Sequence, residues 1–255
     1  MMEDCKTVLG IFAHPDDAEF SCSGTLALLQ ARDWKIHLAS MTAGDLGSVE
    51  LDRKEISTIR KREAKRSAGA LDGKYHCLEC EDIFIFYDRD TLLKVIKLIR
   101  KVKPKIIFTH SPVDYMIDHE NTSKLVQTAA FSAGMPNLLT VPVSHFSPVP
   151  FLYYSDAFEG KDKFGREVFP TILINISSTI EIKETMLSRH KSQRDWLLKH
   201  HGIDEYILSM KRFSSNRGKM IGVNHAEGFR QHLGHAFPQE NILQQELGSL
   251  CQEIH

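Results

Sequence analysis

The chain has 255 residues, of which 42% are hydrophobic and 25% are charged, and its formal net charge is −1. These values are typical of one sizeable globular domain and argue against a broad nucleic-acid surface, which needs clustered positive charge. No apolar run approaches the roughly 18 residues of a membrane-spanning helix, and the N-terminus lacks the basic-then-apolar pattern of a signal peptide. Because the five cysteines are scattered, we expect reduced thiols and a cytoplasmic protein without a membrane span.

Strands and helices are predicted to alternate along the first half of the chain. The apolar runs that predict strands are 6–13, 35–41, 75–78 and 105–110. The segments whose apolar residues recur at helical spacing are 23–32, 55–70, 91–102 and 120–133. This alternation predicts an α/β fold, with a mostly parallel sheet that carries helices on both faces.

The second half of the chain is harder to assign. Residues 138–150 contain three prolines and predict a long connection, and 222–234 predict an irregular polar segment. We expect the C-terminal roughly 20 residues to be a tail or terminal helix, and residues 1–255 to form a single domain. The remaining predicted elements are strands at 151–155 and 171–176 and helices at 179–199 and 203–217, joined by 200–202.

The most informative segment is the end of the first predicted strand, where an apolar run stops at His14-Pro15-Asp16-Asp17. Ligand sites in open α/β sheets lie just past the carboxyl ends of the strands. On its own, however, the segment is equally typical of a turn that caps the following helix, since Asp and Pro favour turns.

A second polar cluster, which ends in Asp118-His119, follows the strand predicted at 105–110. If the two strands are neighbours, His14, Asp17 and His119 supply two imidazoles and a carboxylate with open coordination positions, as in a catalytic zinc site. Asp16 cannot easily share an ion with the adjacent Asp17. It is therefore the candidate general base for the attacking water.

Four segments resemble the PIG-L/LmbE-like family of zinc-dependent N-deacetylases, and the last of them is similar to a late motif of its bacillithiol-pathway members. They are AHPDDAEFSCSGTLA at 13–27, RKREA at 60–64, DHENTSKLV at 118–126 and GVNHAEGF at 222–229. The resemblance implies a Rossmann-like domain that binds one divalent metal, usually Zn²⁺, although such ligands also accept Fe²⁺ or Mn²⁺.

The resemblance also assigns roles to individual residues. It implies His14, Asp17 and His119 as the metal ligands and Asp16 as the base. Arg60 matches an arginine that the family places near the substrate, although a solvated helix charge would look the same in the sequence. As the neighbour of a ligand, Asp118 is a candidate orienting carboxylate. Asp118 would also serve as the N-cap of the helix that follows.

One position departs from the family pattern. Many members have a histidine where this chain has Met116, and that histidine stabilises the oxyanion or protonates the amine. Methionine neither donates a hydrogen bond nor carries a proton. His110, Tyr115 and His225 are the candidates to replace it. We favour His225, because it lies within the late motif, although a lone histidine is more often structural.

We therefore predict an enzyme that hydrolyses the N-acetyl group of an amino sugar or an N-acetylglucosamine conjugate. Its partner is a small N-acetylated amino sugar, and the resemblance implies assembly as a homo-oligomer. Met116 keeps open a second hypothesis, a non-catalytic metal-binding protein on the same fold. A Rossmann-type nucleotide binder is disfavoured, because the first loop lacks G-x-G-x-x-G.

Overall fold

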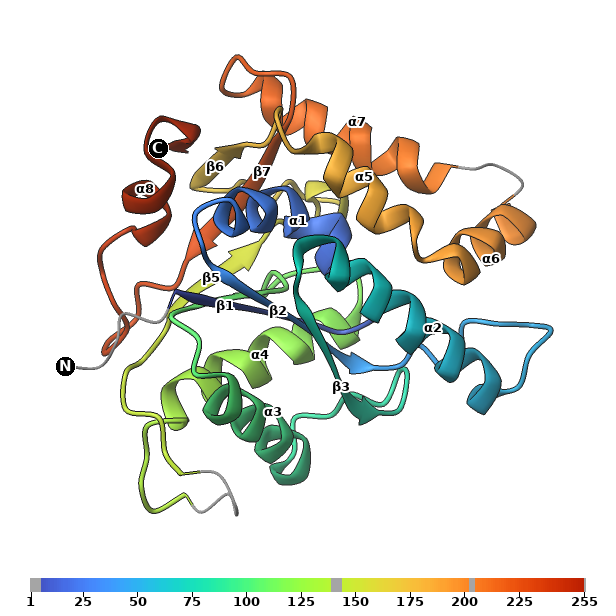
Figure 1. Ribbon diagram of the computed structural model, residues 1–255, viewed down its shortest axis with the longest axis horizontal. Helices are drawn as coiled ribbons and strands as arrows, with labels where there is room; N and C mark the ends of the chain where they lie inside the picture. The colour runs from blue at the N-terminus through green and yellow to red at the C-terminus, as the bar shows by residue number, and fades with distance from the viewer. Residues whose placement is uncertain (1–5, 139–143, 202–204, 255) are drawn as a thin grey trace.

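Residues 6–138, 144–201 and 205–254 are described in the computed structural model, and their strands form one eight-stranded sheet (Figure 1). The strands are β1 (Thr7–Phe12), β2 (Lys35–Thr42), β3 (Lys74–Cys80), β4 (Ile106–Thr109), β5 (Phe151–Ser155), β6 (Ile172–Asn175), β7 (Ala226–Gln231) and β8 (Cys251–Glu253). The helices are α1 (Asp17–Gln30), α2 (Arg53–Ala68), α3 (Arg89–Val102), α4 (Ile117–Ser132), α5 (Ile180–Ser188), α6 (Lys191–His201), α7 (Glu205–Lys219) and α8 (Ile242–Leu247).

The sheet order is β3-β2-β1-β4-β5-β7-β6-β8. Neighbours from β3 to β5 pair in parallel, and the pairs from β5 to β8 are antiparallel. The prediction of an α/β, mostly parallel sheet is confirmed. Strand β1 is buried along its whole length, as expected for a central parallel strand covered on both faces. Because β1 pairs directly with β4, their carboxyl ends meet at one edge of the sheet.

Helices cover both faces of the sheet. On one face, Leu9 and Ile11 of β1 belong to a buried apolar cluster with Ile99 of α3 and Val126 of α4. Residues of alternate register, such as Phe12, point into a second cluster that includes residues of α1, α5 and α8. Figure 1 shows α3 and α4 together on one side of the sheet and α1, α2 and α5 on the other. In the described part of the chain, no helix is long and apolar enough to cross a membrane.

The prediction of one continuous helix at 179–199 is wrong. Helix α5 ends at Ser188 and α6 begins at Lys191. Between them His190 turns inward, is fully buried, and places its Nε2 atom 3.0 Å from the Glu19 carboxylate of α1. The break between the two helices therefore allows His190 to reach Glu19 in the interior. The joint to the next helix was predicted at 200–202, and its last residue lies outside the described residues, as do 203 and 204.

The segment at 222–234 is not irregular throughout, because it contains β7, which lies between β5 and β6. Its polar sequence hid the strand: Glu227 is buried in this strand and pairs with the buried Lys183. Of the two predictions for the C-terminal residues, a tail or a terminal helix, the helix is present. These residues form α8 and then β8, which pairs with β6 at the edge of the sheet. Such short strands depend on pairing partners far away in the sequence.

Candidate active site

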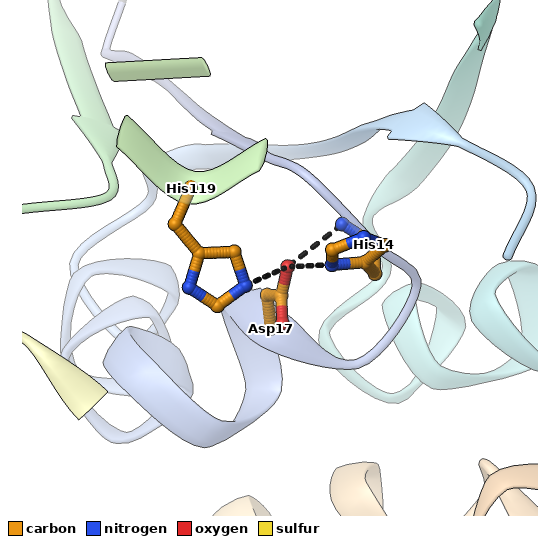
Figure 2. A group of neighbouring side chains, drawn as sticks. All are labelled: His14, Asp17 and His119. Atoms are coloured by element: carbon orange, nitrogen blue, oxygen red, sulfur yellow. Dashed lines mark hydrogen bonds and ion pairs between the residues drawn. The ribbon is translucent and has the colours of Figure 1, made fainter. Parts of the chain in front are cut away.

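Two helices begin at the edge of the sheet where β1 and β4 end. Asp17 is the first residue of α1, and His119 lies in the first turn of α4. His14 belongs to the loop between β1 and α1. Figure 2 shows the three side chains pointing toward one another from these elements. The positive ends of both helix dipoles favour carboxylates here.

The three predicted metal ligands lie close enough to hold one ion. Asp17 Oδ2 is 3.3 Å from His14 Nδ1 and 3.7 Å from His119 Nε2, and the three ligand atoms all lie within 4.8 Å of one another. Two ligand atoms of a tetrahedral zinc site, each about 2.0–2.1 Å from the ion, are about 3.4 Å apart. The donor set and its spacing therefore fit a divalent ion with open coordination positions.

Two carboxylates behind the imidazoles determine which ring nitrogen of His14 and of His119 faces Asp17 and the place for the ion. His119 Nδ1 lies 3.0 Å from Asp114 Oδ1, which leaves Nε2 to face Asp17. His14 Nε2 lies 3.1 Å from Asp82 Oδ1, an ion-pair distance without the alignment of a hydrogen bond. This contact leaves His14 Nδ1 to face Asp17. Carboxylate partners of this kind orient metal-binding histidines and raise their basicity.

The electrostatic surroundings keep Asp17 in the form that binds a cation. Burial opposes ionisation, but the imidazoles of His119, His110 and His14 hold the pKa of the Asp17 carboxyl well below its usual range. The His14 backbone N–H also donates to Asp17 Oδ2 over 2.7 Å. At neutral pH, Asp17 is therefore a pre-formed carboxylate ligand.

Asp118 lies inside α4, whose N-cap is Met116, so the prediction of Asp118 as an N-cap is wrong. Its carboxylate Oδ2 accepts a hydrogen bond from the Ile83 backbone N–H over 2.9 Å and lies 3.5 Å from His14 Nε2. Asp118 therefore stands beside Asp82 behind the ring of His14. This is the position of an orienting carboxylate rather than of a group that touches substrate.

Asp16 is 8% exposed, and its side chain makes no capping hydrogen bond to α1. The alternative that this segment is only a turn capping the helix is therefore not supported by its side-chain contacts. Asp16 has a φ of 101°, which costs backbone energy in a residue other than glycine. The Tyr206 hydroxyl of α7 donates to its Oδ2 atom, and Arg60 Nη2 is 3.8 Å away. Burial raises the pKa of Asp16, with Arg60 opposing that rise. A raised pKa suits a carboxyl group that exchanges protons near neutral pH.

Arg60 is only 4% exposed, so the alternative of a solvated helix charge is wrong. Its guanidinium donates from Nη1 to the Gly44 carbonyl over 3.3 Å and from Nη2 to the Pro15 carbonyl over 3.2 Å. Gly44 has a φ of +66°, and a Cβ atom there would collide with Arg60 Nη1. The glycine therefore makes room for the arginine beside the His14–Asp17 loop.

The structure separates the three candidates for the role of the missing histidine. His110 stacks on the His119 ring at 3.8 Å between centroids, and its Nε2 accepts the Ala13 backbone N–H over 2.9 Å. Burial lowers the pKa of His110 to about 4, so its ring is neutral. Tyr115 lines the cavity above the three ligands, whereas His225 is not among the lining residues. The favoured candidate, His225, is thus not brought to the site.

These groups open into a cavity of about 470 Å³. Asp82, Asp114 and Tyr206 line it, and none of them was singled out from the sequence. Asp82 follows the end of β3, so the rule that located His14 could have located it too. Asp114 lies in the loop that leads into α4, five residues before His119. Nothing in the sequence around Tyr206 indicated a role, because α7 contacts the site only through the tertiary fold.

Comparison with known proteins identifies the family. A family model described as GlcNAc-PI de-N-acetylase (PIG-L) matches residues 9–130. The chain is 30% identical over 207 residues to a probable N-acetyl-alpha-D-glucosaminyl L-malate deacetylase 2 of Bacillus cereus, covering 76% of this chain and 86% of the relative. This chain belongs to the PIG-L family.

Further relatives extend the likeness beyond the segment matched by the PIG-L model. A diacetylchitobiose deacetylase of Thermococcus kodakarensis is 28% identical over 241 residues, covering 89% of this chain and 83% of the relative. The solved N,N'-diacetylchitobiose deacetylase of Pyrococcus horikoshii superposes with a TM-score of 0.76 at 25% identity, covering 94% of this chain and 90% of that one. These PIG-L relatives support N-deacetylation as the chemistry of this chain.

Proposed function

We propose that this PIG-L protein is a metal-dependent N-deacetylase that hydrolyses the acetamido group of a small N-acetylated amino sugar. The observation that carries the proposal is the convergence of His14 Nδ1, Asp17 Oδ2 and His119 Nε2 beside the buried carboxyl of Asp16, in one cavity. The names of the relatives support the reaction class. We further propose that residues 1–255 form a single domain, because β1 and β8 belong to one sheet.

His14, Asp17 and His119 would hold the ion. A divalent cation there would polarise the acetamido carbonyl and lower the pKa of water, which is the chemistry that the side chains alone lack. Zn²⁺ suits two imidazoles and one carboxylate, and Fe²⁺ or Mn²⁺ would accept the same donors.

Asp16 would move the proton. Tyr206 and Arg60 hold its Oδ2 atom, which leaves Oδ1 to take the proton of the attacking water. As the C–N bond breaks, the same carboxyl group would return that proton to the departing amine nitrogen. Met116 offers no second acid, so this double use of Asp16 replaces the histidine found in many relatives.

Tyr115 is the hydroxyl donor that the cavity offers near the ligands. Its ring meets the ring of His119 edge-on, with 5.5 Å between the centroids. Burial and nearby carboxylates raise the pKa of Tyr115, so its hydroxyl stays protonated. We propose that this hydroxyl donates to the carbonyl oxygen as negative charge develops on it.

Two variants test the proposal. Asp16→Asn should bind metal like the wild type and lose most deacetylation of an N-acetylglucosaminide, because an amide does not accept the proton. His119→Ala should lose the metal itself. Asp90→Asn and His235→Ala, at exposed positions away from the cavity, are the matched controls. Full activity in Asp16→Asn would exclude Asp16 as the base.

Met116 favours one second candidate, a metal-binding protein without catalytic activity. That protein would retain stoichiometric metal and hydrolyse none of a panel of N-acetylated amino sugars. Metal analysis combined with acetate release from such a panel separates the two functions directly.

A further inference from the structure

Carboxylates outnumber permanently positive side chains in the lining of the cavity. The carboxylates that line it are Asp16, Asp17, Asp82, Asp114, Asp156 and Glu227. Among the described lining residues, the only side chains with permanent positive charge are Arg60 and Lys183. A divalent ion would add two positive charges, and Arg217 pairs with Asp156 from outside the lining, so the six carboxylates would exceed the positive charges by one.

Both cations already face carboxylates of the protein. Lys183 is fully buried, and its ammonium donates to the Phe20 carbonyl over 2.6 Å and pairs with Glu227 over 2.5 Å. Arg60 donates to two backbone carbonyls and faces Asp16, and only its buried Nε atom has no partner. A carboxylate or phosphate on the substrate would therefore meet mostly like charge in this cavity.

The rest of the lining suits a neutral, hydroxylated ligand. Gln193 reaches the cavity from α6, and its buried Oε1 atom has no hydrogen-bond partner. Because an unpartnered buried amide is costly, a ligand hydroxyl would satisfy it. Leu46, Tyr115 and Phe158 add apolar and aromatic surface, and the last two rings lie 5.4 Å apart. A cavity of about 470 Å³ lies in the range that holds ligands of drug-like size.

We propose, resting on the proposed function, that the site takes uncharged N-acetylated amino sugars and discriminates against conjugates that carry carboxylates. Leu46 is the position that sets this preference. Its side chain lines the cavity and is 42% exposed, so a cation introduced there would face a bound anionic substrate.

The test compares two substrates of the same shape, N-acetyl-α-D-glucosaminyl L-malate and its dimethyl ester, on the metal-loaded protein. The neutral ester should have a kcat/KM about tenfold or more above that of the dianion, because like charges in the cavity disfavour the dianion. High salt should narrow the ratio. Leu46→Lys should narrow it by about two- to fivefold, the range expected for an exposed ion pair.

Val49→Lys is the matched control. Val49 belongs to the same loop as Leu46, is 68% exposed and does not line the cavity. A lysine there adds the same net charge and should leave both the activity and the substrate ratio unchanged. If Val49→Lys changed the ratio as much as Leu46→Lys, the assigned position would be wrong.

The outcomes separate this inference from the function on which it rests. Deacetylation with equal or higher kcat/KM for the dianion overturns the substrate preference and leaves the deacetylase intact. If neither conjugate nor N,N'-diacetylchitobiose is deacetylated by metal-loaded protein, the proposed function fails, and the preference fails with it.

Discussion

Replacing Tyr206 with phenylalanine tests how the candidate base is tuned. The Tyr206 hydroxyl donates to Asp16 Oδ2, and Asp16 is 8% exposed. Hydrogen bonds to charged groups contribute about 1.5–3 kcal/mol. Since about 1.36 kcal/mol corresponds to a factor of ten in proton affinity, the variant should bind the Asp16 proton about ten- to a hundredfold more tightly.

The sign of the pH effect follows from the role of Asp16. The hydrogen bond stabilises the ionised carboxylate, so removing it raises the pKa of Asp16. A base must be ionised, and activity is therefore lost as pH falls. In Tyr206→Phe this loss should begin at a higher pH than in the wild type. The assay is kcat/KM against pH, followed by acetate release from metal-loaded protein.

Tyr153→Phe is the matched control. Its hydroxyl donates over 3.1 Å to Asn241 Oδ1, outside the residues that line the cavity, so the variant should lose stability without changing the pH profile. An acid limb in Tyr206→Phe that coincides with the wild type would refute the role of Asp16 as a base tuned by Tyr206.

Three further predictions follow from buried contacts. Asp114→Asn should weaken zinc affinity about 10- to 100-fold in a chelator competition, because the imidazole it holds loses its orienting carboxylate. Gly44→Ala should cost about 1–3 kcal/mol in urea unfolding and lower kcat, since alanine is strained at the positive φ of residue 44 and its Cβ atom would displace the Arg60 guanidinium. Lys183→Met should cost about 3–5 kcal/mol, because Glu227 is left as an unpaired buried charge.

Controls distinguish these effects from general damage. Gly165 has a φ of +75°, and no atom lies within 4 Å of the place that an alanine Cβ would occupy. Gly165→Ala should therefore lose stability through backbone strain alone and keep its kcat. Lys199 pairs with Glu50, and the two side chains are 57% and 66% exposed, so Lys199→Met should cost no more than about 1 kcal/mol. Equal losses from Lys199→Met and Lys183→Met would contradict the importance assigned to burial.

The sequence predicted the parallel half of the sheet because its strands are apolar runs or alternate apolar and polar residues. In the antiparallel half it predicted β6 but missed β7 and β8, for an identifiable reason. Strand β7 contains Glu227 in a buried position, and its partners are the ammonium of Lys183, 44 residues away, and two backbone N–H groups of α1. No local pattern reports such a pair. The same applies to the break before α6, which depends on the contact between His190 and Glu19.

The amino-acid sequence by itself indicated the metal-site residues, because His14, Asp16 and Asp17 lie within one short segment after a predicted strand. His119 lies in a similar polar segment after another predicted strand. Local spacing is enough to bring such donors to the end of a strand. Only the tertiary structure decided how each group is oriented and tuned. The contact between Tyr206 and Asp16 spans 190 residues and exists because α7 packs over the sheet edge where β1 ends. Orientation and proton affinity depend on such distant neighbours, and a linear pattern does not contain them.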